Sequence, residues 1–448
     1  MTQQPDPLAV FEKALAEVVP IAPPTRDERK VTPIGLDEAH EVARKWLGDE
    51  YDLDALDITL IAAAVERLDG DPLWLLVISG SGNAKTETVQ ALGHQAHVTS
   101  TITSTGALLS ASPKKERAAD ATGGLLRKIG SRGVLVIKDV TSILSQDRNT
   151  RAEVLAALRE VYDGRWERNV GTDGGRTLTW EGRIVVVGAV TTAWDRAHDV
   201  ISAMGDRFVL LRMDSNDGRM AAGRRSIGNT GSEVEMRAEL CDAVAGVLVG
   251  VDPSDVVTLD DEEVETLLLA ADIVTRGRTG VDFDYRGDVI DAHAPEMPTR
   301  FAKQLAQVVR GGCAIGLPRD EAMRLAIRCA RDSMPPLRLD ILLDVAAHPG
   351  STTTQVRKRI GKPRATVDRQ LQSLHMLQLL ECIEDDEYTG NGSAWRYSLG
   401  DGIDPSVLTI PRFVSRSALG HRKEREGTLL APTHISGNGS DITRDKSV

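Results

Sequence analysis

The chain has 448 residues and a formal net charge of −12 at pH 7, and 41% of its residues are hydrophobic. This length predicts two or three globular domains. So acidic a chain excludes nucleic-acid binding over the whole surface, and any DNA contact must come from a local basic patch. The sequence has no run of about 18 apolar residues and no signal-like start, which predicts a cytoplasmic protein without a membrane partner.

Residues 1–70 are expected to form an N-terminal helical extension, because apolar residues recur at helical spacing along much of it. Beyond it, four short apolar runs alternate with helical segments. Continuous apolar runs bounded by glycine or proline are typical of buried parallel strands. The alternation predicts an α/β fold with a three-layer parallel-sheet core over residues 71–214. Its strands are expected at residues 73–79, 134–137, 184–190 and 208–213.

The remaining chain is predicted to contain two further structured parts. A Gly-, Asn- and Ser-rich stretch at 214–232 is interpreted as a hinge, and residues 215–335 are expected to form an almost purely helical lid. Residues 336–400 follow the order helix, turn, helix, turn, helix, hairpin, which predicts a winged helix-turn-helix. Residues 401–448 lack periodicity and are expected to form a disordered tail.

A glycine-rich segment that resembles a phosphate-binding loop follows the first predicted strand. The P-loop pattern G-x-x-x-x-G-K-[ST] is not met strictly, because Ser79 and Ala84 stand where it has glycine. Gly80 and Gly82 nevertheless allow the backbone to curl so that its N–H groups face phosphate oxygens. The predicted ATP site consists of Gly80, Ser81, Gly82, Asn83, Ala84, Lys85 and Thr86.

Two side chains at the end of this loop have specific expected roles. Lys85 can reach the β- and γ-phosphates of ATP, and the Thr86 hydroxyl can ligate Mg²⁺. The start of the following helix adds a favourable dipole. The alternative is a simple glycine-rich turn with an incidental Lys-Thr pair. The position between a buried strand and a helix favours the phosphate loop.

From this loop onward the order of motifs resembles the AAA+ ATPases, and within them the minichromosome-maintenance helicases. That family also has Ala or Ser before the P-loop lysine, as Ala84 stands here, and a segment similar to STGALLSA at 104–111. The resemblance spans residues 73–335 as an order of motifs and only weakly as sequence. It implies ATP and Mg²⁺ as cofactors, DNA as a partner and a homo-oligomeric assembly.

The chain departs from the family at the acidic pair that follows the second buried strand. The family has Asp-Glu there, whereas this chain has Lys138-Asp139. The resemblance implies that Asp139 serves as the catalytic and metal-side carboxylate. A slow ATPase and a nucleotide-binding switch with little hydrolysis both stay open, and so does a Lys-Asp pair that merely ends the strand.

Three further residues match family positions around the γ-phosphate. Thr191, at the end of the third long apolar run, matches the polar sensor. Arg207, in Asp-Arg-Phe, matches the arginine finger that reaches the ATP of a neighbouring subunit. Arg300, in Pro-Thr-Arg-Phe, matches a lid arginine that swings onto the γ-phosphate. Either arginine taken alone can equally be a solvated side chain. Residues 153–171 resemble the helix and hairpin with which this branch contacts DNA or a partner.

The predicted winged helix contains the basic patch that the acidic chain requires for DNA binding. The window 357–369 has a net charge of +5, which suits phosphate contact. A solvated helix face or a protein-binding module is the alternative, and the acidic segment 384–387 argues against deep insertion of the wing. The expected phosphate contacts are Arg357, Lys358, Arg359, Lys362 and Arg364, and the expected major-groove contacts are Thr366, Arg369 and Gln370.

Three functional hypotheses follow from the sequence. The first is an AAA+ ATPase joined to a DNA-binding winged helix, acting in replication or in the biology of a phage or plasmid. The second is a winged-helix transcriptional regulator whose degenerate P-loop module is a nucleotide-gated switch. The third is an assembly scaffold that neither hydrolyses ATP nor reads DNA.

Overall fold

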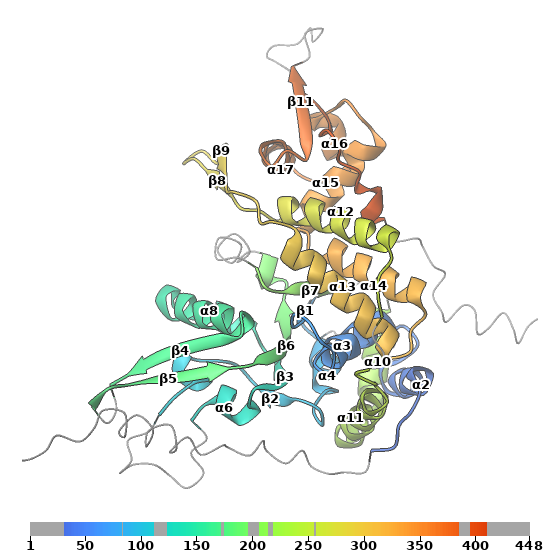
Figure 1. Ribbon diagram of the computed structural model, residues 1–448. Coiled ribbons are helices and arrows are strands. Elements are labelled where there is room, and N and C mark those ends of the chain that lie inside the picture. Colours follow the sequence, from blue (N-terminus) through green and yellow to red (C-terminus); the bar gives the residue numbers. More distant parts are fainter. Residues whose placement is uncertain are drawn as a thin grey trace, which may run out of the picture. The chain divides into compact units, whose positions relative to one another are not determined.

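A computed structural model describes most of the chain between residues 31 and 409 (Figure 1). Asn83 of the predicted phosphate loop, the N-terminal residues 1–30, the tip of the last hairpin and the chain beyond residue 409 lie outside the described part. The described ranges are 31–82, 84–111, 123–171, 174–195, 206–213, 218–254, 257–384 and 395–409.

The centre of the fold is a parallel five-stranded sheet in the order β2-β3-β6-β1-β7. The four strands predicted from apolar runs are confirmed, and the parallel α/β class with them. The short edge strand β2 was missed because its sequence, HVT, contains no apolar run. The strands are β1 (Trp74–Ser79), β2 (His97–Thr99), β3 (Arg132–Ile137), β6 (Arg183–Thr191) and β7 (Val209–Arg212).

Side chains of β1 alternate between two separate hydrophobic clusters, one on each face of the sheet. Leu75 and Val77 pack with α3 (Leu53–Val65) and α4 (Lys85–Gln90), whereas Leu76 and Ile78 belong to the cluster on the opposite face. The sheet is therefore a middle layer. The elements contributing to the second face are α5 (Thr105–Leu108), α6 (Leu125–Ile129), α7 (Thr141–Leu144), α8 (Arg148–Tyr162), β4 (Arg165–Val170) and β5 (Arg176–Glu181).

The helix α3 (Leu53–Val65) is an integral part of the core. The sequence instead predicts an N-terminal extension over residues 1–70. Every residue of α3 from Ala55 to Val65 is buried, because the helix packs on the sheet with one side and on α13 (Thr299–Ala314) with the other. A helix that is apolar on all sides is typical of such a position. The helix α2 (Leu36–Leu47) packs beside it against α11.

The segment after the sheet differs from the expected lid in two respects. The predicted hinge at 214–232 contains a helix, α10, with no buried residue. The lid also contains an antiparallel hairpin, β8–β9, between α12 and α13 (Figure 1). Its remaining elements are α10 (Arg219–Gly228), α11 (Glu233–Val249), α12 (Asp261–Gly277), β8 (Val281–Phe283), β9 (Val289–Ala292) and α14 (Arg319–Asp332).

The last structured part contains three helices and a three-stranded antiparallel sheet in the order β10-β12-β11. Val356, Val367, Leu371 and Leu374 are fully buried between these elements. Its elements are α15 (Pro336–Ala347), β10 (Ser351–Thr352), α16 (Thr353–Ile360), α17 (Arg364–Met376), β11 (Leu380–Glu384) and β12 (Trp395–Leu399). We call residues 335–400 the C-terminal module.

The described start of the expected disordered tail is ordered. The 3-10 helix η3 (Pro405–Leu408) packs against α12, α14 and α15, and the Leu408 side chain is fully buried. An apolar residue placed on an existing core suffices to order this short segment, which has no periodicity of its own. No helix in the described ranges has the length and apolar character needed to cross a membrane.

Candidate functional site

The predicted phosphate loop begins at the carboxyl end of β1, where the connections of the sheet diverge. From β1 the chain continues to the β2 side of the sheet, and it later returns past β1 to form β7. Ligands of open α/β sheets bind in the crevice at such a switch point. Ser79, the last residue of β1, lies beside Thr191, the last residue of β6. The topology therefore places the predicted loop and the predicted sensor next to each other.

The backbone of the loop has the left-handed conformation that a phosphate cradle requires. Gly82 has φ of +80°, and no heavy atom lies within 4 Å of the position that a Cβ would occupy there. Ala84 has φ of +34°, a conformation that costs a non-glycine residue energy. The following helix α4 (Lys85–Gln90) is only six residues long. The dipole expected from it is correspondingly small, and a phosphate would depend on the loop amides and on Lys85.

Lys85 and Asp139 come together at this edge of the sheet. The Lys85 Nζ donates a hydrogen bond to the carbonyl oxygen of Gly80 at 3.0 Å. Partial burial lowers the pKa of Lys85, and the nearby Asp139 carboxylate acts in the opposite direction. The Asp139 side chain is exposed, and Thr86 is half-buried. This edge of the sheet thus combines an ammonium group and a hydroxyl from the loop with the Asp139 carboxylate after β3. These groups can hold a nucleotide together with Mg²⁺ because that ion prefers oxygen ligands.

Thr191 is positioned by a second hydroxyl side chain. The Thr191 amide donates to the Thr141 Oγ1 at 3.1 Å, and the two hydroxyl oxygens lie 3.4 Å apart. Ser142, next along the chain, donates to the carbonyl oxygen of Asp139 at 2.7 Å. The short helix α7 therefore links the end of β3 to the end of β6, and it brings Asp139 and Thr191 to the same edge as Lys85.

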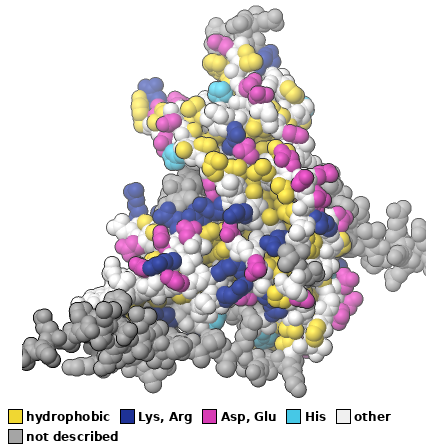
Figure 2. Space-filling model, in the orientation of Figure 1, with side chains coloured by type: hydrophobic (Ala, Val, Ile, Leu, Met, Phe, Trp, Pro, Cys, Tyr) yellow, Lys and Arg dark blue, Asp and Glu magenta, His cyan; other side chains and the backbone are white. Residues whose placement is uncertain are grey.

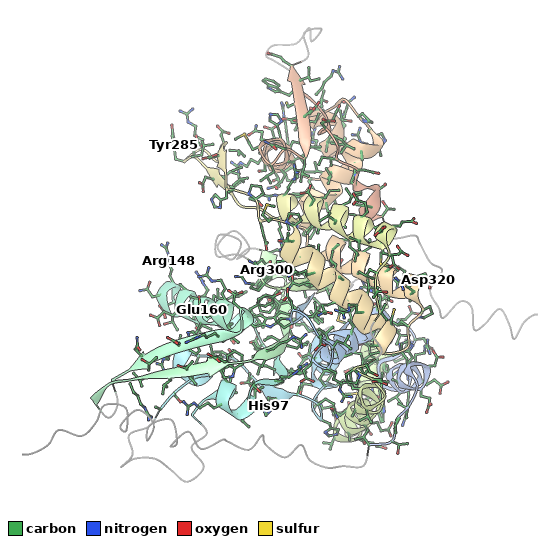
Figure 3. All side chains as sticks on the ribbon, viewed as in Figure 1. His97, Arg148, Glu160, Tyr285, Arg300 and Asp320 are labelled. Atoms are coloured by element: carbon green, nitrogen blue, oxygen red, sulfur yellow. The ribbon has the colours of Figure 1, made fainter. Side chains whose placement is uncertain are left out.

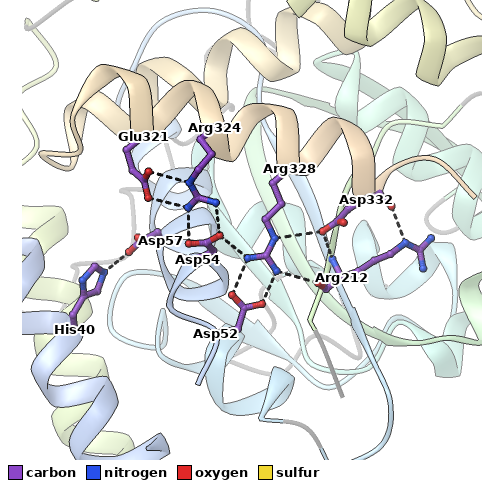
Figure 4. A network of polar contacts seen from close by, with 9 residues as sticks. All are labelled: His40, Asp52, Asp54, Asp57, Arg212, Glu321, Arg324, Arg328 and Asp332. Carbon is purple, nitrogen blue, oxygen red and sulfur yellow. Dashed lines mark hydrogen bonds and ion pairs between the residues drawn. The ribbon is translucent and has the colours of Figure 1, made fainter. Parts of the chain in front are cut away.

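Sequence reasoning missed an ion-pair network at the same carboxyl edge (Figure 4). Arg212, the last residue of β7, donates to both carboxylate oxygens of Asp195 at 3.0 and 2.7 Å. Asp332, at the end of α14, accepts a hydrogen bond from the Arg212 amide at 2.8 Å. Burial raises the pKa of Asp332 to about 6, against the effect of nearby Arg328.

Arg328 of α14 continues this network toward the phosphate-loop helix. Its guanidinium contacts both Asp52 and Asp54, with N···O distances of 2.5 to 2.8 Å. Asp52 directly precedes α3, and the adjacent Tyr51 hydroxyl lies 2.8 Å from the Thr88 Oγ1 of α4. The network therefore joins the lid, the end of β7 and the flank of the phosphate loop. The ion pairs of this network join residues that are far apart in the sequence, and local sequence patterns therefore do not predict it.

Arg207 and Arg300 lie at the opposite edge of the sheet. Arg207 precedes β7, and Nη2 of its guanidinium lies 3.3 Å from the Asp163 Oδ2. Arg300 lies 2.9 Å from the Glu296 carboxylate and donates to the carbonyl oxygen of Asp206 at 3.5 Å. Figure 3 labels Arg300 near the end of α8, and Figure 2 shows Lys and Arg side chains gathered there.

This placement corrects the expected position of Arg300. Because β1 and β7 are parallel, their amino ends lie at one edge of the sheet and their carboxyl ends at the other. Arg207 and Arg300 lie at the amino edge, and the predicted phosphate loop lies at the carboxyl edge. Arg300 is therefore not brought to Lys85 of its own chain. Arg207 was expected to serve a neighbour, and its place at the edge away from its own loop agrees with that geometry. Its side chain is only 13% exposed, because Asp163 and the Tyr162 ring cover it.

The same edge holds a buried arginine that the sequence did not single out. Arg278 is 3% exposed, pairs with Glu296 at 2.8 Å and lies 3.9 Å from the Asp206 carboxylate. Its guanidinium also stacks over the Phe301 ring, 4.5 Å from the centroid. Burial raises the pKa of Asp206, with Arg278 opposing that shift. The cluster ties the end of α12 and the start of α13 to the segment before β7.

The residues predicted to contact phosphates divide into two groups. Lys358, Lys362 and Arg364 are exposed, and Arg357 is half-buried. Arg359 instead forms a bidentate ion pair with Asp344, with both N···O distances at 2.7 Å. That pair holds α16 against α15. The basic patch is therefore present, but Arg359 is committed to packing within the C-terminal module.

The three residues predicted to read base edges are also divided. Thr366 is exposed near the start of α17. Arg369 donates to the carbonyl oxygen of Arg286 at 3.1 Å, and the Gln370 Oε1 accepts from Arg338 at 3.0 Å. Two of the three are thus engaged inside the molecule. The helix and hairpin expected in 153–171 are present as α8 and β4–β5, with the turn at 172–173 outside the described part.

No protein-family model matches the sequence, and no curated protein matches it. Among solved structures, the chain is similar to the C-terminal region of NrS-1 at 12% identity and a TM-score of 0.30, over 85% of this chain and 79% of that chain. It is also similar to the ORC1 protein of Aeropyrum pernix, solved in complex with DNA, at 14% identity and a TM-score of 0.23. That match covers 85% of this chain and 94% of that chain. Similarity at this level identifies neither a family nor a function.

Proposed function

We propose that this protein is an AAA+-type ATP-binding protein that acts on DNA through a C-terminal winged helix. The setting we infer is DNA replication or the biology of a mobile element such as a phage or plasmid. ATP and Mg²⁺ are its cofactors, and the active form is a homo-oligomer. The observation that carries the proposal is the meeting of Lys85, Asp139 and Thr191 at the switch point of the sheet.

In this proposal each group at the carboxyl edge of the sheet contacts a different part of the bound nucleotide and its Mg²⁺ ion. The amides of the loop and Lys85 hold the phosphates. Thr86 and Asp139 supply oxygen ligands for Mg²⁺. Thr191, whose amide donates to the Thr141 hydroxyl, would donate a hydrogen bond from its own hydroxyl to the terminal phosphate. Bound ATP would supply a phosphoanhydride bond between its β- and γ-phosphates, whose hydrolysis by water would give ADP and phosphate.

The acidic pair supports a second candidate, a nucleotide-gated DNA-binding regulator with little hydrolysis. Lys138 stands where the family has its metal-side aspartate, and the Asp139 side chain is exposed. A single carboxylate then has to serve both the metal and the attacking water. Steady-state ATPase activity measured with and without duplex DNA separates the two candidates. Retention of DNA at moderate salt separates both from a pure scaffold.

The first test is ATP binding to the full chain, measured by isothermal titration calorimetry in the presence of Mg²⁺. Lys85→Ala removes the charge nearest the loop, and we expect ATP affinity to fall at least about tenfold, the equivalent of roughly 1.4 kcal/mol. Lys303→Ala is the matched control, because Lys303 is an exposed lysine at the opposite edge, paired with Asp71. Equal ATP affinity of wild type and Lys85→Ala contradicts the nucleotide site.

A further inference from the structure

The β8–β9 hairpin lies against the helix that is proposed to read DNA (Figure 1). Arg369 of α17 donates to the carbonyl oxygen of Arg286 in the hairpin turn at 3.1 Å. The adjacent Gly287 has φ of +84°, and a Cβ at this position would lie 2.3 Å from the Arg369 Nη2. The turn is therefore in close contact with the Arg369 guanidinium, at a distance that only glycine permits.

A second contact on the same face of α17 comes from Arg338 of α15, which also binds the end of α12 just before the hairpin. Gln370 accepts a hydrogen bond from Arg338 at 3.0 Å. Arg338 is 5% exposed and also donates to the carbonyl oxygens of Gly277 and Thr279, at the end of α12, at 2.9 and 2.6 Å. Residues three and four apart share a helix face. Thr366, Arg369 and Gln370 therefore share one face. The hairpin contacts Arg369 on this face, and Arg338 of α15 contacts Gln370.

The charge of the hairpin opposes DNA at this position. Residues 281–292 contain four aspartates, Asp282, Asp284, Asp288 and Asp291, against the single Arg286. The neighbouring window 357–369 has a net charge of +5. An acidic strand pair attracts a basic helix but repels the phosphates of a duplex that approaches the same face. A duplex also needs the space beside α17, because a reading helix enters the major groove.

We propose that the β8–β9 hairpin is an autoinhibitory cover of α17, so that the C-terminal module binds duplex DNA tightly only after the hairpin leaves. This inference rests on the proposed DNA-binding function of that module. Tyr285, at the hairpin tip, is 89% exposed and points away from the molecule (Figure 3). The tip thus adds little packing, and the contact between the hairpin turn and Arg369 holds the cover closed.

The base of the cover is connected to the edge of the sheet that bears Arg207. The two legs of the hairpin emerge next to Arg278 and Glu296, which pair at 2.8 Å. Glu296 in turn pairs with Arg300, and Arg278 lies beside Asp206, which directly precedes Arg207. A subunit that docks at this edge and draws on Arg207 or Arg300 therefore perturbs the base of the hairpin. This provides a route by which assembly releases the cover.

The test is the affinity of the full chain for a fluorescein-labelled, mixed-sequence duplex, measured by anisotropy at fixed moderate salt. One variant replaces residues 282–291 with a short Gly-Ser linker. The other is Gly287→Ala, whose Cβ displaces the Arg369 guanidinium from the turn and strains the turn at its positive φ. We expect both to bind DNA more tightly than wild type, by about tenfold if the uncovered form makes up about a tenth of the wild-type molecules. Gly402→Ala is the matched control, since Gly402 also has positive φ but has open space around it.

The possible outcomes separate this proposal from the proposed function. Unchanged or weaker DNA binding by both hairpin variants, while wild type binds DNA, overturns the cover and leaves the DNA-binding function standing. No binding by any of the proteins at low salt overturns the DNA-binding function and the cover together. Thermal melting of each variant identifies a folding defect. If only the linker variant fails to fold, the affinity of Gly287→Ala decides.

Discussion

At the scale of single residues, Ala84 shows how the degenerate phosphate loop retains the backbone shape of a glycine-rich one. Its φ of +34° lies in the left-handed region, where a non-glycine residue is disfavoured by roughly 1–2 kcal/mol. A glycine in its place relieves this strain but adds about 0.5–1 kcal/mol of backbone entropy to the unfolded chain. The strained backbone conformation of Ala84 therefore persists because the surrounding structure holds it in place.

We expect Ala84→Gly to leave ATP affinity intact and to stabilise the core by up to about 1.5 kcal/mol, the largest difference between these two effects. Urea denaturation monitored by tryptophan fluorescence measures the change. Ala365→Gly, at an exposed position of α17 with ordinary helical geometry, is the control and should destabilise by about 0.5–1 kcal/mol. A destabilised Ala84→Gly protein contradicts the assignment of strain to this residue.

Asp332 makes a defined contribution to the pH dependence of stability. Its pKa in the folded protein is about 6, above the value of about 3.9 for an unfolded chain. The folded state thus binds the proton more tightly, so this group lowers the free energy of unfolding as pH rises from about 4 to about 6. The linkage limits the loss to about 3 kcal/mol.

Asp332→Asn retains an oxygen for the Arg212 amide but does not titrate, so its stability should fall less over this pH range than that of wild type. Chemical denaturation at half-unit pH steps gives the comparison. Asp54→Asn is a control of opposite sign, because Arg324 and Arg328 lower the pKa of Asp54 despite its burial. Parallel pH profiles for wild type and Asp332→Asn would exclude the assigned titration.

At the scale of elements, the basic residues of α16 and of the turn before α17 have two different roles. Some face solvent, and one forms an ion pair that holds the C-terminal module together. Lys358 and Lys362 are exposed, whereas Arg359 pairs with Asp344. Each phosphate contact removed should reduce the magnitude of the slope of log K against log salt by about 0.9 for duplex DNA. We expect this change for Lys358→Ala and Lys362→Ala, and little change in slope for Arg359→Ala. Anisotropy titrations over a salt series measure it, and equal slopes for all three variants contradict the division.

The elements also show where sequence patterns stop being informative. The apolar runs of β1, β3, β6 and β7 identified buried parallel strands, because such strands face a core on both sides. The same criterion applied to α3 would have placed it inside the core, since ALDITLIAAAV is apolar on every face. The β8–β9 hairpin has no such signal. Its strands are short and largely exposed, with one aspartate in each, Asp282 and Asp291, and their pairing depends on the turn.

At the scale of the whole molecule, the two sets of proposed catalytic residues lie at opposite edges of one sheet. In the proposed oligomer, Lys85 of one subunit would act together with Arg207 of another, and Arg300 shares the edge of Arg207. We expect Lys85→Ala and Arg207→Ala each to lose most ATPase activity alone, and mixed oligomers to regain part of it at interfaces that combine one intact residue of each kind. Arg300→Ala should complement Lys85→Ala in the same way.

The mixing experiment compares ATPase activity per total protein across mixing ratios, with size-exclusion chromatography confirming assembly. Lys303→Ala, on the same edge as Arg207, serves as the control and should retain full activity. Full activity of Arg207→Ala by itself removes the finger assignment. Complementation by Arg207→Ala but not by Arg300→Ala would restrict the shared role to Arg207.

The sequence by itself determined the parallel α/β core, the position of a glycine-rich loop after its first strand, and the basic window of the C-terminal module. Those features are local, since an apolar run, a glycine-rich turn and a cluster of charges are each contained in a few consecutive residues. Only the tertiary structure decided that Arg300 lies away from Lys85, that Arg328 ties the lid to Asp52, and that a hairpin engages Arg369. These are contacts between residues distant in the chain, which depend on how the elements pack, and no local pattern of residues specifies them.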